Sequence, residues 1–315
     1  NCFFYLFFRT FMRKVLFLVL AFFCVSPSSA TADDISSLAD NLENRLLFNL
    51  SNSISEMLGQ AATTVLPGEG ITEIDIQMEE KGEPHYSILG VRDISKSEDS
   101  NLFTQFSLHN SDVTGDERLI FNFGIGKRFL NADNSMMFGA NSFLDFGIGE
   151  AHKRGSVGFE ARASILEFTF NHYHPLSNTI VIDGTKEKTL ETTEWNLSTQ
   201  VPYAPWARLY WQGYKHQADM ATVNTEGDIY SLEIAINPTL KFEVDHENTN
   251  HADGDVWGAN IRFVYPPQES GPSMLDGLSS DMFAKEDMAN KLSSKVRRNN
   301  NIVLEKQGAV IITSK

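Results

Sequence analysis

The chain has 315 residues and a formal net charge of −15 at pH 7. So acidic a charge argues against a general nucleic-acid binder, which usually shows a basic patch, and we expect no nucleic acid among its partners. Its two cysteines, Cys2 and Cys24, lie near the start, so the sequence from residue 33 onward receives no help from disulfides.

Residues 1–32 are predicted to comprise a few upstream residues and a secretory signal peptide. A basic start, Arg13 and Lys14, precedes an apolar run from Val15 to Val25 and the small residues SPSSATA. This order is typical of a cleaved signal, and we predict cleavage after Ala32. An uncleaved membrane anchor is the alternative, but the apolar run is shorter than the ~20 residues that a span needs.

Residues 33–70 are predicted to form a periplasmic helical segment. Apolar residues recur there at helical spacing: Leu38, Leu42, Leu46, Ile54 and Leu58. Pro67 and Gly68 end the pattern. No later run is long and apolar enough for a membrane helix, so a mature chain that enters a membrane must do so as a closed barrel.

Residues 71–265 alternate with a period of two and predict about twelve strands, each about ten residues long. The last of them sets an apolar row against a polar row: Trp257, Ala259, Ile261, Phe263 and Tyr265 against Gly258, Asn260 and Arg262. Clusters of turn-forming residues separate the strands, and the longest connection is expected at residues 175–189.

Two architectures produce this alternation: a soluble periplasmic sandwich with a bound ligand, and a transmembrane barrel with a polar interior. The polar rows mix charges of both signs with many glycines, as facing rows across a lumen would. Aromatic residues also gather at strand ends, as in membrane-interface girdles: Phe129, Tyr173, Tyr203, Trp206, Trp211, Trp257 and Tyr265. We therefore predict an all-β fold, a twelve-stranded antiparallel transmembrane β-barrel over residues 71–265.

Charged residues on the inner register are the candidate functional residues. The lumen-facing candidates are Arg118, Arg128, Asp145, Glu160, Arg162 and Arg262, and the same row includes Lys127, Arg208, Glu194, Glu233 and Glu243. Opposed charges across a lumen can hold a threaded chain, or they can simply line a hydrated interior. Glycines on or near this register would let a backbone pass closely or would let the barrel curve: Gly124, Gly126, Gly139, Gly147, Gly155 and Gly158.

Three other chemistries are weaker interpretations. His172 and His174 share a strand face, as a metal pair would, but have no further ligand nearby. Ser142 and His172 lack the local pattern of a hydrolase. The acidic residues between Asp245 and Asp255 match no calcium loop. We therefore expect no catalytic residue, no metal, no cofactor and no enzymatic activity.

Two local motifs resemble the β-domain of the inverse autotransporters, the intimin and invasin adhesins. The first is GIGKRFLNADNSMMFGANSFLDFGIGEAHKRGSVGFEAR, from Gly124 to Arg162, and the second is RRNNNIVLEKQG, from Arg297 to Gly308. The resemblance implies a twelve-stranded barrel in the outer membrane of a Gram-negative bacterium, working in type V secretion. It also implies that the linker, residues 266–315, turns back through the pore and carries an adhesive passenger to the surface.

The resemblance also assigns roles to particular residues. The pore-lying part of the linker would be Arg297, Arg298, Asn299, Asn300 and Asn301. The aromatic end of the last strand, Phe263 and Tyr265, would face lipid and form the assembly signal, with Arg262 facing the lumen. The implied partners are outer-membrane lipid, the barrel-assembly machinery and periplasmic chaperones, with peptidoglycan left open.

The sequence departs from this family at both ends. Residues 266–315 contain no passenger domain, and residues 33–70 contain no peptidoglycan-binding module. A truncated gene, a minimal barrel and a porter with separately encoded cargo therefore all stay open. The alternative function is a porin-like channel without a passenger.

Overall fold

A computed structural model describes residues 68–311, except 81–83, 114–115, 252–253, 269–270 and 307–308. The predicted signal with its cleavage site at Ala32 and the predicted helix before Pro67 lie outside the described residues. Within the described ranges, no helix has both the length and the apolar character needed to cross a membrane.

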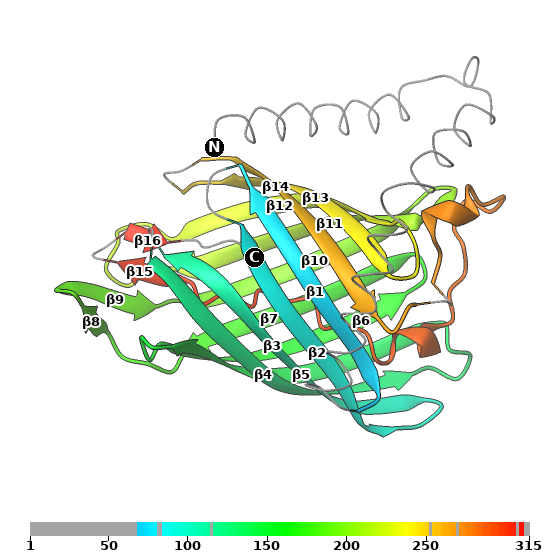
Figure 1. Ribbon diagram of the computed structural model, residues 1–315, viewed down its shortest axis with the longest axis horizontal. Coiled ribbons are helices and arrows are strands. Elements are labelled where there is room, and N and C mark those ends of the chain that lie inside the picture. Colours follow the sequence, from blue (N-terminus) through cyan, green and yellow to red (C-terminus); the bar gives the residue numbers. More distant parts are fainter. Residues whose placement is uncertain are drawn as a thin grey trace, which may run out of the picture. The chain divides into compact units, whose positions relative to one another are not determined.

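Twelve strands close into an antiparallel barrel in which each strand pairs with the next and the last pairs with the first (Figure 1). They are β1 (Gly70–Glu79), β2 (His85–Lys96), β3 (Ser100–Val113), β4 (Asp116–Leu130), β5 (Met136–Ile148), β6 (Lys153–Ala163), β7 (Leu166–Pro175), β10 (Glu191–Val201), β11 (Ala204–Gln217), β12 (Thr225–Ala235), β13 (Leu240–Thr249) and β14 (Val256–Tyr265). The predicted twelve-stranded all-β barrel is confirmed.

The barrel is apolar outside and polar inside, which is why its strands alternate. In β4, Phe121 and Phe123 are 37% and 47% exposed on the outer face, whereas Asn122 between them is 1% exposed and faces the lumen. A soluble sandwich would bury its phenylalanines between two sheets. The alternative of a periplasmic sandwich is therefore wrong, because the sheet closes on itself and turns its apolar face outward.

The two ends of the barrel differ, and we name them by the strands that meet there. At the near mouth, where β1 begins and β14 ends, connections have two to five residues. The far mouth carries the longest connection, which contains a hairpin of β8 (Ile180–Ile182) and β9 (Thr185–Thr189). Asp183 and Gly184 form its turn, both with positive φ, as an Asp-Gly hairpin turn requires.

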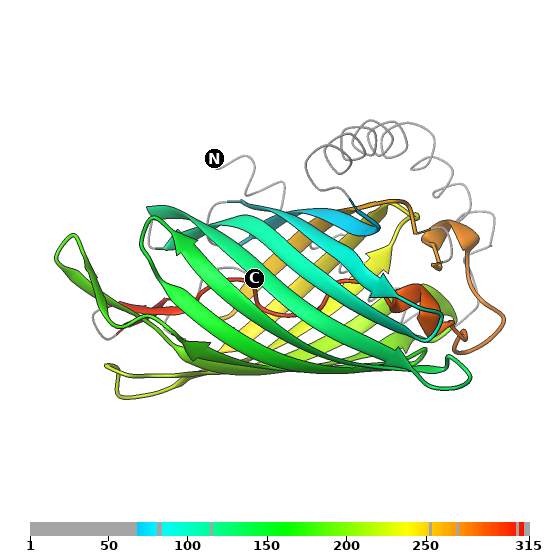
Figure 2. The ribbon, with the colours of Figure 1, turned by 90° about the horizontal axis from the view of Figure 1, so that it is seen from below.

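The chain after β14 passes the near mouth and then enters the barrel. It forms two short 3₁₀ helices, η2 (Met274–Asp276) and η3 (Met288–Lys291), before it runs through the interior (Figure 2). It emerges as β15 (Leu304–Lys306) and β16 (Ala309–Ile311), which extend the hairpin into a four-stranded sheet of order β16-β15-β9-β8. We call residues 292–303 the linker segment.

Gly124 of β4 lies very close to the aromatic ring of Phe143. A Cβ built on Gly124 would lie 2.3 Å from the Phe143 ring, which is buried in the lumen. We expect Gly124→Ala to lower the free energy of unfolding by about 1–3 kcal/mol, as overpacking does.

Denaturant unfolding in detergent measures the effect, and Gly147→Ala is the control. The nearest atom to a Cβ at Gly147 is 3.5 Å away, an ordinary contact, so we expect a change within about 0.5 kcal/mol. Equal effects of the two substitutions would contradict the close approach at Gly124.

Candidate functional site: the occupied lumen

Arginines of the barrel wall donate hydrogen bonds to the backbone of the linker segment where it enters the lumen. Arg128 Nη1 donates to the carbonyl oxygens of Leu292 and Ser294, at 2.9 and 2.5 Å. Arg162 Nη2 donates to the carbonyl oxygen of Lys295 at 2.9 Å. Such contacts recognise any backbone, because every residue offers a carbonyl.

One buried carboxylate positions both arginines. Glu160 Oε1 accepts from Arg128 Nε at 2.6 Å, and Glu160 Oε2 accepts from Arg162 Nη2 at 2.7 Å. The Arg128 guanidinium also lies over the Phe103 ring, 4.3 Å from its centroid. Charge-assisted hydrogen bonds of this kind fix the direction of a planar guanidinium.

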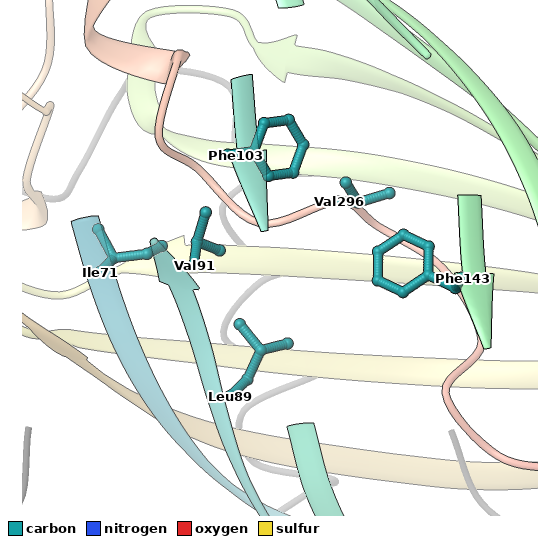
Figure 3. Packing of buried hydrophobic residues seen from close by; sticks show 6 residues of the cluster. All are labelled: Ile71, Leu89, Val91, Phe103, Phe143 and Val296. Atoms are coloured by element: carbon teal, nitrogen blue, oxygen red, sulfur yellow. The ribbon is translucent and has the colours of Figure 1, made fainter. Parts of the chain in front are cut away.

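Val296 is the apolar contact of the linker segment with the wall. It lies among Ile71, Leu89, Val91, Phe103 and Phe143, which come from four strands (Figure 3). Its backbone N–H donates to Gln105 Oε1 at 2.8 Å. A single valine therefore packs in an apolar patch of an otherwise polar lumen.

Arg298 forms the most buried ion pairs of the linker segment. Its Nη2 lies 2.7 Å from Asp145 Oδ2, and Arg154 Nε of the wall lies 2.8 Å from the same oxygen. All three side chains are fully buried, and the Arg298 guanidinium stacks 4.3 Å from the Phe143 centroid. Asp145 therefore depends on two arginines, one from the wall and one from the linker segment.

The backbone of Asn299 is bound on both sides. Its N–H lies 2.9 Å from Tyr173 Oη and 3.0 Å from Glu194 Oε1, and its carbonyl accepts from Arg154 Nη2 at 2.8 Å. Tyr173 was predicted to belong to an outer aromatic girdle, and that prediction is wrong. The residue opposes Ser156 in the interior row, and its side chain is fully buried.

The next two asparagines continue the contacts toward the far mouth. Asn122 Nδ2 donates to the carbonyl oxygen of Asn300 at 2.9 Å. Asn301 Oδ1 lies 2.6 Å from His109 Nε2, and its own N–H donates to Asn299 Oδ1 at 2.8 Å. Asparagine suits this place because its side chain both donates and accepts.

Arg262, on the last strand, faces four carboxylates. Its nitrogens lie 2.7 Å from Asp75, 2.6 Å from Glu233, 3.3 Å from Glu73 and 3.4 Å from Glu243. Arg262 and Asp75 are partners in the β1–β14 pair, which closes the barrel. The predicted inward position of Arg262 thus places it at the seam of the barrel.

The linker segment adds two cations to this group. Lys295 Nζ lies 2.7 Å from Glu73, and Arg297 is ion-paired with Glu243. Lys241 of the wall lies 3.1 Å from Glu233. We define the Arg262 cluster as eight residues: Glu73, Asp75, Glu233, Lys241, Glu243, Arg262, Lys295 and Arg297.

At the far mouth, Arg118 contacts the hairpin rather than the linker segment. It binds Glu187 of β9 through two nitrogens, at 2.7 and 2.9 Å, and His152 Nε2 lies 3.0 Å from the same carboxylate. Glu305 of β15 accepts from the backbone N–H groups of residues 219–221. These contacts hold the emerging chain against the hairpin and against the loop between β11 and β12.

Acid should weaken this far-mouth contact. Hydrogen bonds from Arg118 lower the pKa of Glu187 to about 2, against an ordinary value of 4.5. A carboxyl with a lowered folded pKa stabilises the fold above its unfolded pKa and loses that contribution as pH falls through the folded value. We expect β15–β9 pairing to be unchanged from about pH 7 to pH 5 and to weaken between about pH 4.5 and pH 2.

Hydrogen exchange at residues 304–306, corrected for intrinsic rates, measures this pairing. Glu187→Gln should flatten the pH profile. Glu226→Gln, at an exposed ion pair with Lys215, is the matched control and should leave it unchanged. A wild-type profile that is flat down to pH 2 would refute the assignment.

The structure places the six lumen-facing candidates inside the barrel: Arg118, Arg128, Asp145, Glu160, Arg162 and Arg262. It places the linker residues Arg297, Arg298, Asn299, Asn300 and Asn301 there too. Two residues that were also expected in or near the inner row face outward. Lys127 precedes inward Arg128 and lies over the ring of outward Phe129, and Gly155 opposes outward Leu144. Phe263 and Tyr265 occupy the row opposite Arg262, but Phe263 is only 5% exposed.

Sequence reasoning missed several interior residues, among them Glu73, Asp75, His109 and Arg154. Asp75 and Glu73 had a signal, because they alternate with the outward isoleucines of the first strand. His109 and Arg154 also lie in polar rows, but their partners in the linker segment are distant in sequence and left no signal.

The residues of the metal-pair and hydrolase interpretations are not brought together into a site. Ser142 and His172 flank Val157 in one row across three strands, and they bond to Ser156 and Thr193 respectively. His174 pairs with Glu191. Across the described ranges, no group of three or more His, Cys, Asp or Glu side chains is placed to hold a metal ion.

A closed barrel with an apolar exterior, and with its own C-terminal chain inside the lumen, is an outer-membrane β-barrel of the translocator class. The inverse autotransporter β-domain family matches residues 26–300. The chain belongs to this family and is located in the outer membrane of a Gram-negative bacterium.

The chain is similar to the inverse autotransporter adhesin YeeJ of Escherichia coli (strain K12), with 24% identity over 220 residues. That match covers 66% of this chain and 9% of YeeJ, so the chain spans a small part of its relative. Among solved structures, one from work on the in-meso crystallization of membrane proteins has a TM-score of 0.59 and 17% identity, covering 75% of this chain and 99% of the other. An outer membrane channel from Pseudomonas putida F1 has a TM-score of 0.46 and 10% identity, covering 62% and 94%.

Proposed function

We propose that this barrel anchors the chain in the outer membrane and presents whatever follows residue 311 at the cell surface. One observation carries the proposal: wall side chains contact the backbone of the linker segment repeatedly between Leu292 and Asn300. The likeness to an adhesin supports an adhesive role for the presented segment.

The wall contacts the linker segment in two ways, which have different roles in export. Arg128, Arg162 and Arg154 donate to carbonyl oxygens, which every sequence offers, so these contacts suit a chain that moves through. Arg298 and Asn301 are bound through their side chains, which suits a chain that has stopped in one register. Export on this account makes and breaks no covalent bond.

Assembly of the barrel is part of the same proposal. The last strand ends in Phe263 and Tyr265, on the face opposite Arg262, and this aromatic end suits recognition by the barrel-assembly machinery after delivery by periplasmic chaperones. A porin-like channel is the second candidate, and two cavities beside the linker segment favour it.

An epitope tag placed after Lys315, behind a protease site, tests the proposal. We expect antibody to label intact Gram-negative cells and added protease to release the tag. A soluble periplasmic protein serves as the control for membrane integrity. A tag that becomes accessible only after the outer membrane is opened would refute surface presentation.

A further inference from the structure

Two cavities lie beside the linker segment, on the side of the lumen formed by β1–β3 and β11–β14. The first has a volume of about 130 Å³, extends toward the far mouth, and is lined by polar wall residues such as Gln77, Ser231 and Asn260. The second has a volume of about 390 Å³ and extends toward the near mouth, where Trp206 and Gln268 line it. Both are large enough to hold several water molecules.

The Arg262 cluster separates the two cavities. Asp75, Glu243, Arg262, Lys295 and Arg297 line the first cavity, whereas Glu73, Glu233 and Lys241 line the second. Ion pairs join the two sets, at 2.6 Å from Arg262 to Glu233 and 2.7 Å from Lys295 to Glu73. A chain of charged contacts therefore closes the space beside the linker segment.

The charge of this cluster is balanced only when the linker segment is in place. The wall supplies four carboxylates but only two cations, Arg262 and Lys241. Lys295 and Arg297 supply the other two. Withdrawing them would leave the wall with two uncompensated negative charges in a narrow polar space, and such a constriction attracts cations and repels anions.

We propose that the two cavities are halves of one passage for small monovalent cations, closed by the Arg262 cluster and opened when Lys295 and Arg297 leave their carboxylates. This inference goes beyond the proposed function, because conduction requires no export. It gives the linker segment a second role, as the removable part of a charge seal.

Conductance of the purified full chain in planar bilayers under a KCl gradient tests the passage. The wild-type protein should stay mostly closed. The variant Lys295→Gln with Arg297→Gln should open and should pass K⁺ over Cl⁻ by at least ~3-fold, as expected for a pore lined by acidic side chains. The control variant is Lys188→Gln with Lys215→Gln. It removes the same amount of positive charge at positions that line neither cavity, and it should leave the protein closed.

Selectivity separates a charge seal from general loosening of the linker segment. Adding Glu73→Gln and Glu243→Gln to the double variant restores neutrality, so this protein should conduct with no preference for cations. If the double variant stays as closed as the wild type, or opens without cation preference, the proposal is overturned.

Two further measurements keep the test decisive. Unheated electrophoretic mobility reports whether each barrel is folded, and the single variant Lys295→Gln replaces the double variant if the latter is unfolded. The surface tag after Lys315 is measured on the same proteins. Tag exposure with a closed double variant would reject the passage alone, and cation conduction with a protected tag would reject only surface presentation.

Discussion

Replacing Arg262 with alanine is expected to lower the free energy of unfolding by about 3–5 kcal/mol, the usual effect of removing one partner of a buried ion pair. Arg262 is 6% exposed and contacts carboxylates on β1, β12 and β13. Without it, those carboxylates repel one another from the two sides of β14, the strand that closes the barrel against β1. The loss should therefore appear as opening of the β1–β14 seam.

Urea unfolding in detergent, followed by tryptophan fluorescence, measures this effect. Arg262→Lys keeps the charge but loses the planar fork that contacts several carboxylates, so we expect an intermediate loss. Lys215→Ala, at an exposed pair, is the control and should change stability little. An alanine variant as stable as the wild type would show that the seam does not depend on Arg262.

Asp145→Ala is expected to cost a similar amount, about 3–5 kcal/mol, for a different structural reason. It leaves Arg154 and Arg298 buried without their shared carboxylate. Because Arg298 belongs to the linker segment, the variant should also raise hydrogen exchange along residues 292–303. Arg262→Ala, by contrast, should act mainly on the wall.

A double-mutant cycle isolates the pair. Asp145→Ala and Arg298→Ala together should cost less than the sum of the single variants, with a coupling energy of about 1–3 kcal/mol. Asp145→Asn, which keeps an acceptor but removes the charge, should lose less than alanine does. Strict additivity of the two alanine substitutions would mean that the linker segment and the wall are energetically independent there.

Much of the barrel could be predicted because its strands are amphipathic with a period of two. In β5, Phe143 and Leu144 fall on opposite faces, at 2% and 44% exposure, as alternation requires. The inward position of Asp145 and Glu160 follows from the same count. Closure and strand number then follow from twelve such segments that cannot leave an edge in a membrane.

Two predictions from the sequence differ from the structure, because each relied on residue type or on loop length rather than on the row in which the residues lie. Tyr173 was assigned by its aromatic character, yet its row faces inward and its hydroxyl contacts Glu194 and Asn299. The hairpin of β8 and β9 was expected only as a long loop, although its Asp-Gly turn carried a sequence signal. The partners of the linker segment could not be predicted, because they are set by the depth at which it stops in the lumen.

Pairing of β15 with β9 has a mechanical consequence. A pull on the chain beyond β16 reaches β15 through the β16–β15 pair, and the hydrogen bonds of the β15–β9 pair then resist displacement of the emerging chain. Only Leu190 separates β9 from β10, and tension therefore passes directly into the barrel wall. The contacts inside the pore, from Arg298 to Arg128, come under load only after this outer clamp gives way.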